Sequence, residues 1–269
     1  TDTFIANSGQ QITINGGATV YNPPVASTLR TTTDLGFLDL DGVAGSHGYV
    51  DLLGFSETDP HSYYAKFTRT DLLDSVYVVS TRVDTLGGLS IYTNNTGVLR
   101  AYIGATSIGS TAPGLIIAGQ EYEVILNADG AGNYELFLDG VSVLSVANAG
   151  VFDTTTGLFV GARGTNPSDS TTSTLNLTGK VSQVQAYSSA VTPATIGAAT
   201  PVLDVDFRNL STTLTDTDTF VATSGQTVTI NGGATARRKI TLNPDGFLHL
   251  DGVSGSYASV PDATGVTGD

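Results

Sequence analysis

The sequence predicts an all-β fold built from short antiparallel strands. Hydrophobic and polar residues alternate with a period of two in many short runs rich in Val, Ile, Tyr and Phe. Gly-containing turn signals separate these runs, and Asp129-Gly130 and Asp139-Gly140 are typical of hairpins. Helix-like and strand-like segments do not alternate, so a parallel α/β sheet is not expected. Short strands at regular spacing indicate a sandwich or a barrel.

The predicted strands follow one another along the chain. Residues 11–15 (QITIN) and 227–231 (TVTIN) place Ile or Val on one face and polar residues on the other. Residues 37–41 (FLDLD) and 247–251 (FLHLD) have the same pattern. The other runs are 75–83, 89–92, 98–103, 121–126, 134–138, 141–146, 158–160, 180–187 and 202–207. Only residues 192–199 (TPATIGAA) have a helical pattern, with Pro193 suited to a first turn, so we expect no helix longer than about three turns.

A long internal repeat organises the chain. Residues 217–236 (TDTFVATSGQTVTINGGATA) repeat residues 1–20 (TDTFIANSGQQITINGGATV), with fifteen of twenty positions identical. Residues 247–256 (FLHLDGVSGS) repeat residues 37–46 (FLDLDGVAGS), at an offset of 210 instead of 216. The first copy therefore has six extra residues within 21–36, where we expect a loop containing Pro23 and Pro24. We also expect the two copies of the 20-residue segment to share one backbone shape.

A period of this length is that of a whole domain. We therefore predict one domain over residues 1–200. Residues 201–269 are predicted to be the opening strands of a second, incomplete copy or strands that close the first domain. The chain lacks Met and a basic, apolar signal peptide, and we interpret it as a processed or excised piece of a longer protein.

Composition excludes several classes of function. The formal net charge of −14 argues against nucleic-acid binding, which needs a basic face. This charge fits an extracellular surface or a site that gathers Ca²⁺. The absence of Cys excludes disulfides, thiolate catalysis and Cys-ligated zinc. No run approaches eighteen apolar residues, so no membrane insertion by a spanning helix is expected.

Five segments, taken in order, carry a resemblance to a known family. Residues 37–49 (FLDLDGVAGSHGY) and 247–262 (FLHLDGVSGSYASVPD) resemble the opening of laminin G-like, concanavalin A-like jelly-roll domains. Residues 134–143 (YELFLDGVSV) resemble the family's Asp-Gly hairpin, and residues 158–163 (LFVGAR) resemble a later strand. Residues 179–196 (GKVSQVQAYSSAVTPATI) resemble its closing strand and short helix. The Thr/Gly-rich repeats also resemble modules of phage virion appendages.

The resemblance implies an antiparallel two-sheet jelly-roll sandwich in which the first strand lies beside the last. Residues 202–207 (VLDVDF) match that first strand for the second copy. Either the first copy lacks its N-terminal strand, or residues 202–207 close the first domain beside residues 180–187. An unpaired sheet edge is a liability, which favours some such closure.

No catalytic constellation is visible. The E-x-D-x-E pattern of glycosidases on this fold does not occur. Glu121 and Glu123 share one strand face, roughly 6.5–7 Å apart along the strand. They could form an acid–base pair, or they could simply lie on the solvent face of a half-buried strand. His47, His61 and His249 lack metal-ligand spacing, and G-x-S-x-G is absent. We therefore predict that the chain is not an enzyme.

Calcium is the candidate cofactor, because it takes oxygen ligands from Asp and loop carbonyls. Asp39 and Asp41 share a strand face, and Asp251 is the counterpart of Asp41. The alternative for Asp41 and Asp251 is the Asp of an Asp-Gly turn, which bonds its own backbone. Relatives often carry an acidic pair in the closing strand, where this chain has Ser182 and Gln183.

Glycan binding would rest on tyrosine stacking, since the chain has no Trp. Tyrosines are available at positions 63, 64, 77, 92, 102, 122, 134 and 187. Tyr63 and Tyr64 follow the polar stretch 56–62 and are the best exposed candidates. The alternative is the start of a strand with one ring in the core.

Together these observations predict a non-catalytic binding or adhesion module of a repetitive extracellular or phage virion appendage. Its expected partners are surface glycans, neighbouring copies and other virion or surface proteins. One alternative is a purely structural decoration domain without a ligand. The other is an accessory domain of a glycan-active enzyme.

Overall fold

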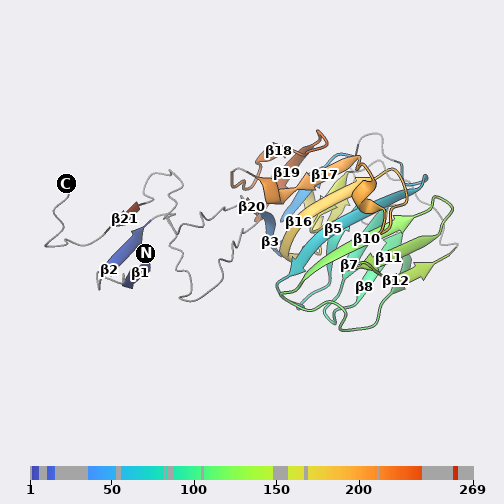
Figure 1. Ribbon diagram of the computed structural model, residues 1–269, viewed down its shortest axis with the longest axis horizontal. Coiled ribbons are helices and arrows are strands. Elements are labelled where there is room, and N and C mark those ends of the chain that lie inside the picture. Colours follow the sequence, from blue (N-terminus) through green and yellow to red (C-terminus); the bar gives the residue numbers. More distant parts are fainter. Residues whose placement is uncertain are drawn as a thin grey trace. The chain divides into compact units, whose positions relative to one another are not determined.

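The computed structural model describes residues 2–5, 11–15, 36–52, 56–81, 83, 88–103, 106–147, 157–166, 169–210, 212–237 and 257–259. The chain forms two compact units. One, the terminal unit, combines Thr1–Asp34 with Ile240–Asp269; the other, the sandwich unit, is Leu35–Lys239. The sandwich unit consists of two eight-stranded sheets packed face to face (Figure 1). Every strand pair within these sheets is antiparallel, as predicted.

The first sheet is called the β5 sheet after its central strand. Its order is β12-β11-β10-β5-β16-β3-β20, and β17 also pairs with β16 (Figure 1). The strands are β3 (Phe37–Asp41), β5 (His61–Arg69), β10 (Glu121–Ala128), β11 (Tyr134–Leu138), β12 (Val141–Val146), β16 (Thr178–Tyr187), β17 (Leu203–Asp206) and β20 (Thr235–Arg237).

The second sheet, the β7 sheet, has the order β18-β19-β4-β13-β6-β7-β8-β9. Its strands are β4 (His47–Val50), β6 (Val76–Ser80), β7 (Leu89–Thr93), β8 (Leu99–Ile103), β9 (Thr106–Ser110), β13 (Leu158–Val160), β18 (Thr219–Val221) and β19 (Thr227–Asn231). A separate hairpin pairs β14 (Arg163–Asn166) with β15 (Asp169–Thr174).

The main core lies between the two sheets, where alternate residues of each strand turn inward. On β5 these are Tyr63, Ala65 and Phe67, followed by Arg69, whose side chain is fully buried. Arg69 donates hydrogen bonds to Thr93 Oγ1 and to the carbonyls of Asn94 and Asp74, at 2.8–2.9 Å. Burial lowers the pKa of Arg69, since desolvation disfavours its charge.

A second apolar cluster lies on the outer face of the β5 sheet. It consists of Tyr64, Ile125, Phe137, Tyr187 and Val191, with Ile196 and Ala199 packed against it. The segment predicted to be helical supplies this cover, but it forms only the single 3₁₀ turn η1 (Ile196–Ala198). A second 3₁₀ turn, η2 (Phe207–Asn209), follows β17. Within the described residues these two turns are the only helical elements.

Strands that follow residue 200 complete the sandwich unit. β17 pairs with β16 from Gln183↔Asp206 to Ala186↔Leu203, which is the closing arrangement named among the sequence alternatives. The repeated segment then adds β19 to β4 and β20 to β3. Val228 and Ile230 on β19 are fully buried in the core. The sandwich unit therefore includes the strands up to β20.

The terminal unit contains a small antiparallel sheet with the order β1-β2-β21. Its strands are β1 (Asp2–Ile5), β2 (Gln11–Asn15) and β21 (Tyr257–Ser259). The predicted loop with Pro23 and Pro24, the predicted strand 247–251, Asp251 and His249 lie outside the described residues.

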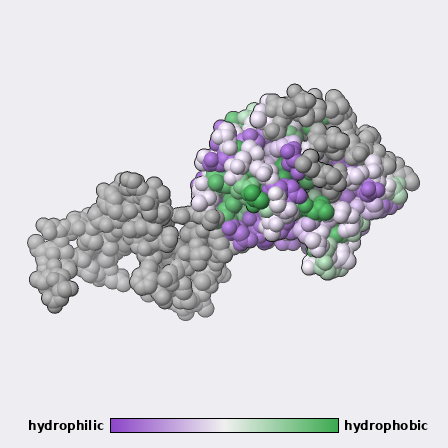
Figure 2. Space-filling model, turned by 90° about the horizontal axis from the view of Figure 1, so that it is seen from above, coloured by the Kyte–Doolittle hydropathy of each residue, from purple (hydrophilic) through white to green (hydrophobic). Residues whose placement is uncertain are grey.

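The surface of the sandwich unit mixes polar and apolar residues, and on the side seen in Figure 2 the apolar residues are interspersed with polar ones. In the part of the chain that the structure describes, the exposed large hydrophobic side chains are Val43, Leu73, Ile117, Val141, Leu175, Val202 and Val221. Among the described residues no helix is both long and apolar enough to cross a membrane.

Candidate functional site

Three tyrosines gather on the outer face of the β7 sheet. Tyr77 on β6 pairs directly with Tyr92 on β7, and Tyr102 on β8 lies diagonally across from Tyr92. The intervening residues of β7 and β8, such as Ile91 and Ala101, occupy the core, so alternation turns the tyrosines outward. Ring centroids are 5.2 Å apart for Tyr77–Tyr92 and 5.5 Å for Tyr92–Tyr102, both edge-to-face. Tyr92 and Tyr102 are half-buried, so part of each ring meets solvent.

Two arginines flank this tyrosine cluster (Tyr77, Tyr92 and Tyr102). Arg100 on β8 is the direct cross-strand partner of Tyr92. The guanidinium carbon of Arg163 on β14 lies 5.6 Å from the centroid of the Tyr77 ring, within the range of a cation–π contact. Both arginines are half-buried. A guanidinium is a fixed array of donors, which suits hydroxyl and carboxylate oxygens.

The β14–β15 hairpin covers the β13 side of the tyrosine cluster. Gly164 lies directly on Phe159, because a Cβ atom there would be 2.6 Å from the ring. Phe159 and Tyr77 are consequently buried, at 1% and 2% exposure. The accessible part of the tyrosine cluster is therefore formed by Tyr92 and Tyr102, and Arg100 flanks it.

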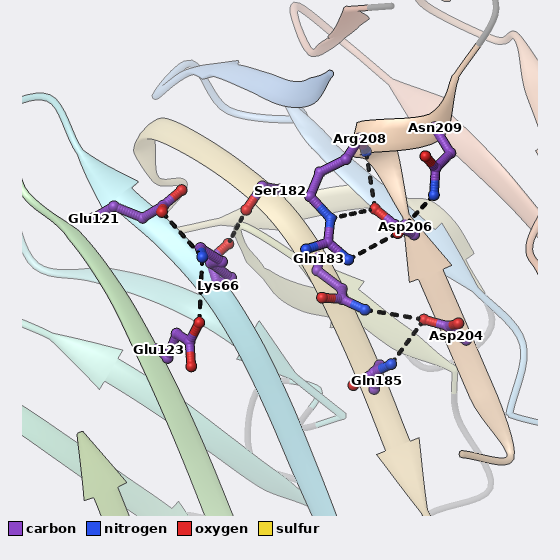
Figure 3. A network of polar contacts seen from close by, with 10 residues as sticks. All are labelled: Lys66, Glu121, Glu123, Ser182, Gln183, Gln185, Asp204, Asp206, Arg208 and Asn209. Carbon is purple, nitrogen blue, oxygen red and sulfur yellow. Dashed lines mark hydrogen bonds and ion pairs between the residues drawn. The ribbon is translucent and has the colours of Figure 1, made fainter. Parts of the chain in front are cut away.

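The outer face of the β5 sheet carries a different, polar surface (Figure 3). Strand register places Glu123, Lys66, Gln183 and Asp206 in one row across four neighbouring strands. Lys66 Nζ lies 3.2 Å from a carboxylate oxygen of Glu123 and equally far from one of Glu121. Burial alone would lower the pKa of Lys66, but hydrogen bonds and charge from the two glutamates outweigh it and raise that pKa.

The remaining polar groups of this face are also paired with one another. Asp206 accepts hydrogen bonds from Arg208 Nε at 2.7 Å, from Arg208 Nη2 at 2.8 Å and from the Asn209 amide (Figure 3). Those bonds raise the pKa of Arg208. Asp204 accepts from the side-chain amides of Gln183 and Gln185. The arrangement supports the solvent-face interpretation of the predicted glutamate pair, because both carboxylates are half-exposed and already pair with Lys66.

The structure does not expose the predicted stacking residues Tyr63 and Tyr64. Tyr63 is 2% exposed, and its hydroxyl donates to Glu57 Oε1 at 2.7 Å inside the unit. Tyr64 is 8% exposed and belongs to the outer apolar cluster. Burial, with the nearby Glu123 charge, raises the pKa of Tyr64. The expectation of exposure is wrong because both residues lie inside the central strand β5, one ring in the core and the other beneath the segment that contains η1.

Two of the predicted calcium ligands, Asp39 and Asp41, accept hydrogen bonds from other groups of the chain. Asp39 Oδ2 accepts a hydrogen bond from Arg237 Nε at 2.9 Å. Asp41 Oδ1 accepts from the backbone N–H of Val43 at 3.0 Å, as the Asp-Gly turn alternative requires. Asp251 lies outside the described residues. No three His, Asp or Glu side chains of the described part of the chain form a group that could hold a metal ion, and calcium binding stays a prediction.

Sequence reasoning named Tyr77, Tyr92 and Tyr102 only as available rings. The signal that could have predicted the cluster is the alternation of inward and outward residues along each strand. Tyr92 and Tyr102 occupy the same phase as Ser90 and Arg100 of their strands, while the aliphatic neighbours take the inward phase. Tyr77 has no such polar partner on its phase, because Val79 stands there. Alternation within one strand does not predict the register between strands, and that register is what brings the three tyrosines together.

No family model and no curated protein matches the sequence of this chain. Among solved structures, the chain is similar to a putative carbohydrate binding protein from Bacteroides ovatus, with a TM-score of 0.57 and 15% identity. That similarity covers 78% of this chain and 62% of the other, so this chain spans about three fifths of it.

Two further similarities concern smaller parts of this chain. The SAP-like pentraxin of Limulus polyphemus gives a TM-score of 0.46 at 17% identity, covering 62% of this chain and 80% of that one. The Ruminococcus gnavus IT-sialidase CBM40, solved with α2,3-sialyllactose, gives 0.44 at 14% identity, covering 60% and 96%. The architecture of the sandwich unit and the similarity to the B. ovatus protein establish an antiparallel jelly-roll sandwich of the concanavalin A-like kind.

Proposed function

We propose that the sandwich unit is a non-catalytic glycan-binding module whose ligand contacts the tyrosine cluster. The observation that carries the proposal is the pair of half-buried tyrosines, Tyr92 and Tyr102, with Arg100 as the direct cross-strand partner of Tyr92. Sugars present apolar faces that pack on aromatic rings and hydroxyls that accept hydrogen bonds, and this site offers a partner for each. The polar face of the β5 sheet is less suitable, because its charged groups already satisfy one another.

Binding at one such site is weak. A single ring contributes on the order of 1 kcal/mol, and the site is an open face formed by two rings. We expect dissociation constants near the millimolar range, corresponding to about −4 kcal/mol. Useful avidity would then come from several copies. This fits a repetitive extracellular or virion surface appendage, the setting that the internal repeat suggests.

The fold offers supporting analogy only. The B. ovatus protein is described as a putative carbohydrate binding protein, and one jelly-roll fold serves many functions. A structural decoration domain without a ligand is the second candidate. The observation in its favour is the polar face of Figure 3, whose charged groups need no outside partner.

The test is a glycan microarray of neutral, carboxylated and sulfated oligosaccharides probed with the chain presented in many copies, so that millimolar single-site binding becomes detectable. Titration of the strongest hit followed by NMR, with Ca²⁺ and with chelator, then measures the single site. Tyr92→Ala and Tyr102→Ala should each weaken binding about five- to tenfold, the equivalent of roughly 1 kcal/mol. Glu121→Ala, on the opposite sheet, is the matched control and should bind like the wild type. Binding that survives both tyrosine changes would contradict the site. Absence of binding to every glycan would favour the structural candidate.

A further inference from the structure

The β18–β19 hairpin closes the sandwich unit at the edge of β4. The Cα partners are Asn231↔His47, Ile230↔Gly48 and Thr229↔Tyr49. The contact is apolar on its inner side, where Ile230 is fully buried. On the other side of Asn231, a Cβ atom on Gly232 would lie 2.6 Å from the Gly45 backbone, so the turn after β19 lies directly on the loop that precedes β4.

The turn of the same hairpin docks on β17. The backbone N–H of Asp204 donates to Ser224 Oγ at 2.7 Å, and Gln226 Nε2 donates to the Val202 carbonyl at 2.7 Å. Ser224 and Gln226 of the repeated segment therefore hold the hairpin against the rest of the sandwich unit.

The contact residues recur in the first copy of the segment. Ser8, Gln10, Asn15 and Gly16 stand where the sandwich unit has Ser224, Gln226, Asn231 and Gly232. The opposing loop recurs as well, since DGVAGS at residues 41–46 is matched by DGVSGS at residues 251–256. Both sides of the closing contact are thus present a second time, one near each end of the chain.

The terminal unit joins these two segments in the register of the sandwich unit. Its Cα partners are Asn15↔Tyr257, Ile14↔Ala258 and Thr13↔Ser259. Adding 216 to the first residue number of each pair and subtracting 210 from the second gives the three pairs between β19 and β4. The hairpin pairing Thr3↔Thr13 likewise corresponds to Thr219↔Thr229. A slip by one residue would reverse both faces of the strand, so the coincidence of register is informative.

We propose that residues 1–20 are the closing hairpin of a second copy of this fold, and that their binding partner is the opening strand of that copy at Tyr257–Ser259 of the same chain. The boundaries of the sequence repeat then differ from the boundaries of the folded domain. The repeated segment ends a domain, and the next copy opens at residue 247. This inference does not depend on the proposed glycan binding.

The natural absence of Cys provides a direct test, since two introduced thiols are the only ones in the chain. Paired Cα atoms of neighbouring strands lie within the span of a disulfide. In the full chain, Thr13→Cys with Ser259→Cys probes the terminal unit, and Thr229→Cys with Tyr49→Cys probes the equivalent pair of the sandwich unit. Thr13→Cys with Ala258→Cys is the control shifted by one residue, because adjacent positions of a strand face opposite sides of a sheet.

After oxidation of dilute protein, peptide mapping by mass spectrometry should find a disulfide between the thiols introduced at positions 13 and 259 of one chain. Its yield should be similar to that of the reference pair, and the shifted control should give much less. Equal yields for the in-register and shifted pairs would overturn the proposal, as would links formed only between chains. A thermal transition of the sandwich unit close to that of the wild type would show that the reference variant, altered at positions 49 and 229, is folded.

Discussion

Replacing Ile230 by Ala tests whether the repeated segment belongs to the core of the sandwich unit. Ile230 is fully buried between the sheets and pairs with Gly48 of β4. Truncation of a buried Ile to Ala costs about 2–5 kcal/mol, since it removes apolar contacts and leaves a cavity. For a domain of this size each 1 kcal/mol lowers the melting temperature by about 2–4 °C, so a loss of about 3 kcal/mol corresponds to roughly 6–12 °C.

The matched control is Ile14→Ala, the same change at the equivalent position of the first copy. Ile14 belongs to the terminal unit, so its truncation should leave the main transition in place. Differential scanning calorimetry of the full chain measures both variants against the wild type. An unchanged main transition in Ile230→Ala, or an equal shift in Ile14→Ala, would refute the assignment of residues 217–237 to the sandwich unit.

Three further predictions concern charges and ionisation. Arg69→Met should destabilise the chain by about 3 kcal/mol in urea unfolding, because the buried Thr93 hydroxyl and two partly buried carbonyls lose their charged donor; a change below about 1 kcal/mol would contradict this. Glu121→Gln with Glu123→Gln should change stability by less than about 1 kcal/mol, because both carboxylates are about half exposed; a loss that persists in high salt would contradict a surface ion pair. Burial, foremost among the causes, raises the pKa of Tyr49 and Tyr134 to about 12, whereas unfolded tyrosines ionise near pH 10. The contribution of these two tyrosines to the free energy of unfolding should therefore be fully present below about pH 10 and be lost between about pH 10 and 12, where only the unfolded chain has lost these protons. Tyrosinate absorbance from these two residues near pH 10 in the native protein would contradict this prediction.

Local patterns predicted the elements whose geometry is decided locally. The runs predicted at 134–138, 141–146 and 158–160 are β11, β12 and β13, residue for residue. The turn between β11 and β12 is the predicted Asp139-Gly140, and Asp139 adopts the positive φ of 47° that such a turn requires. Alternation and turn chemistry act over a few residues, so a single sequence contains them in full.

Elements decided by distant partners were not predictable in this way. The central strand β5 was named only as the alternative for Tyr63 and Tyr64, and its inward row ends in Arg69, a residue type rarely buried. Its partners Thr93 and Asn94 lie 24 and 25 residues away, and nothing in the local pattern announces them. The interpretation of Tyr63 and Tyr64 as exposed competed with this strand, and the structure contains the strand. The tyrosine cluster depends likewise on register, which shifts by an irregularity between Tyr77 and Val79.

Closure by the last strands has a consequence for folding. β3 and β4 are formed from residues 37–50, but their outer neighbours β20 and β19 come from residues 227–237. The ion pair of Asp39 with Arg237 spans 198 positions of sequence. Contacts of such separation are made late and slowly, because a long loop must close first. Until they form, β3 and β4 present open edges to other chains. The closing hairpin and β20 therefore cover the edges of β4 and β3 as well as stabilising the sandwich unit.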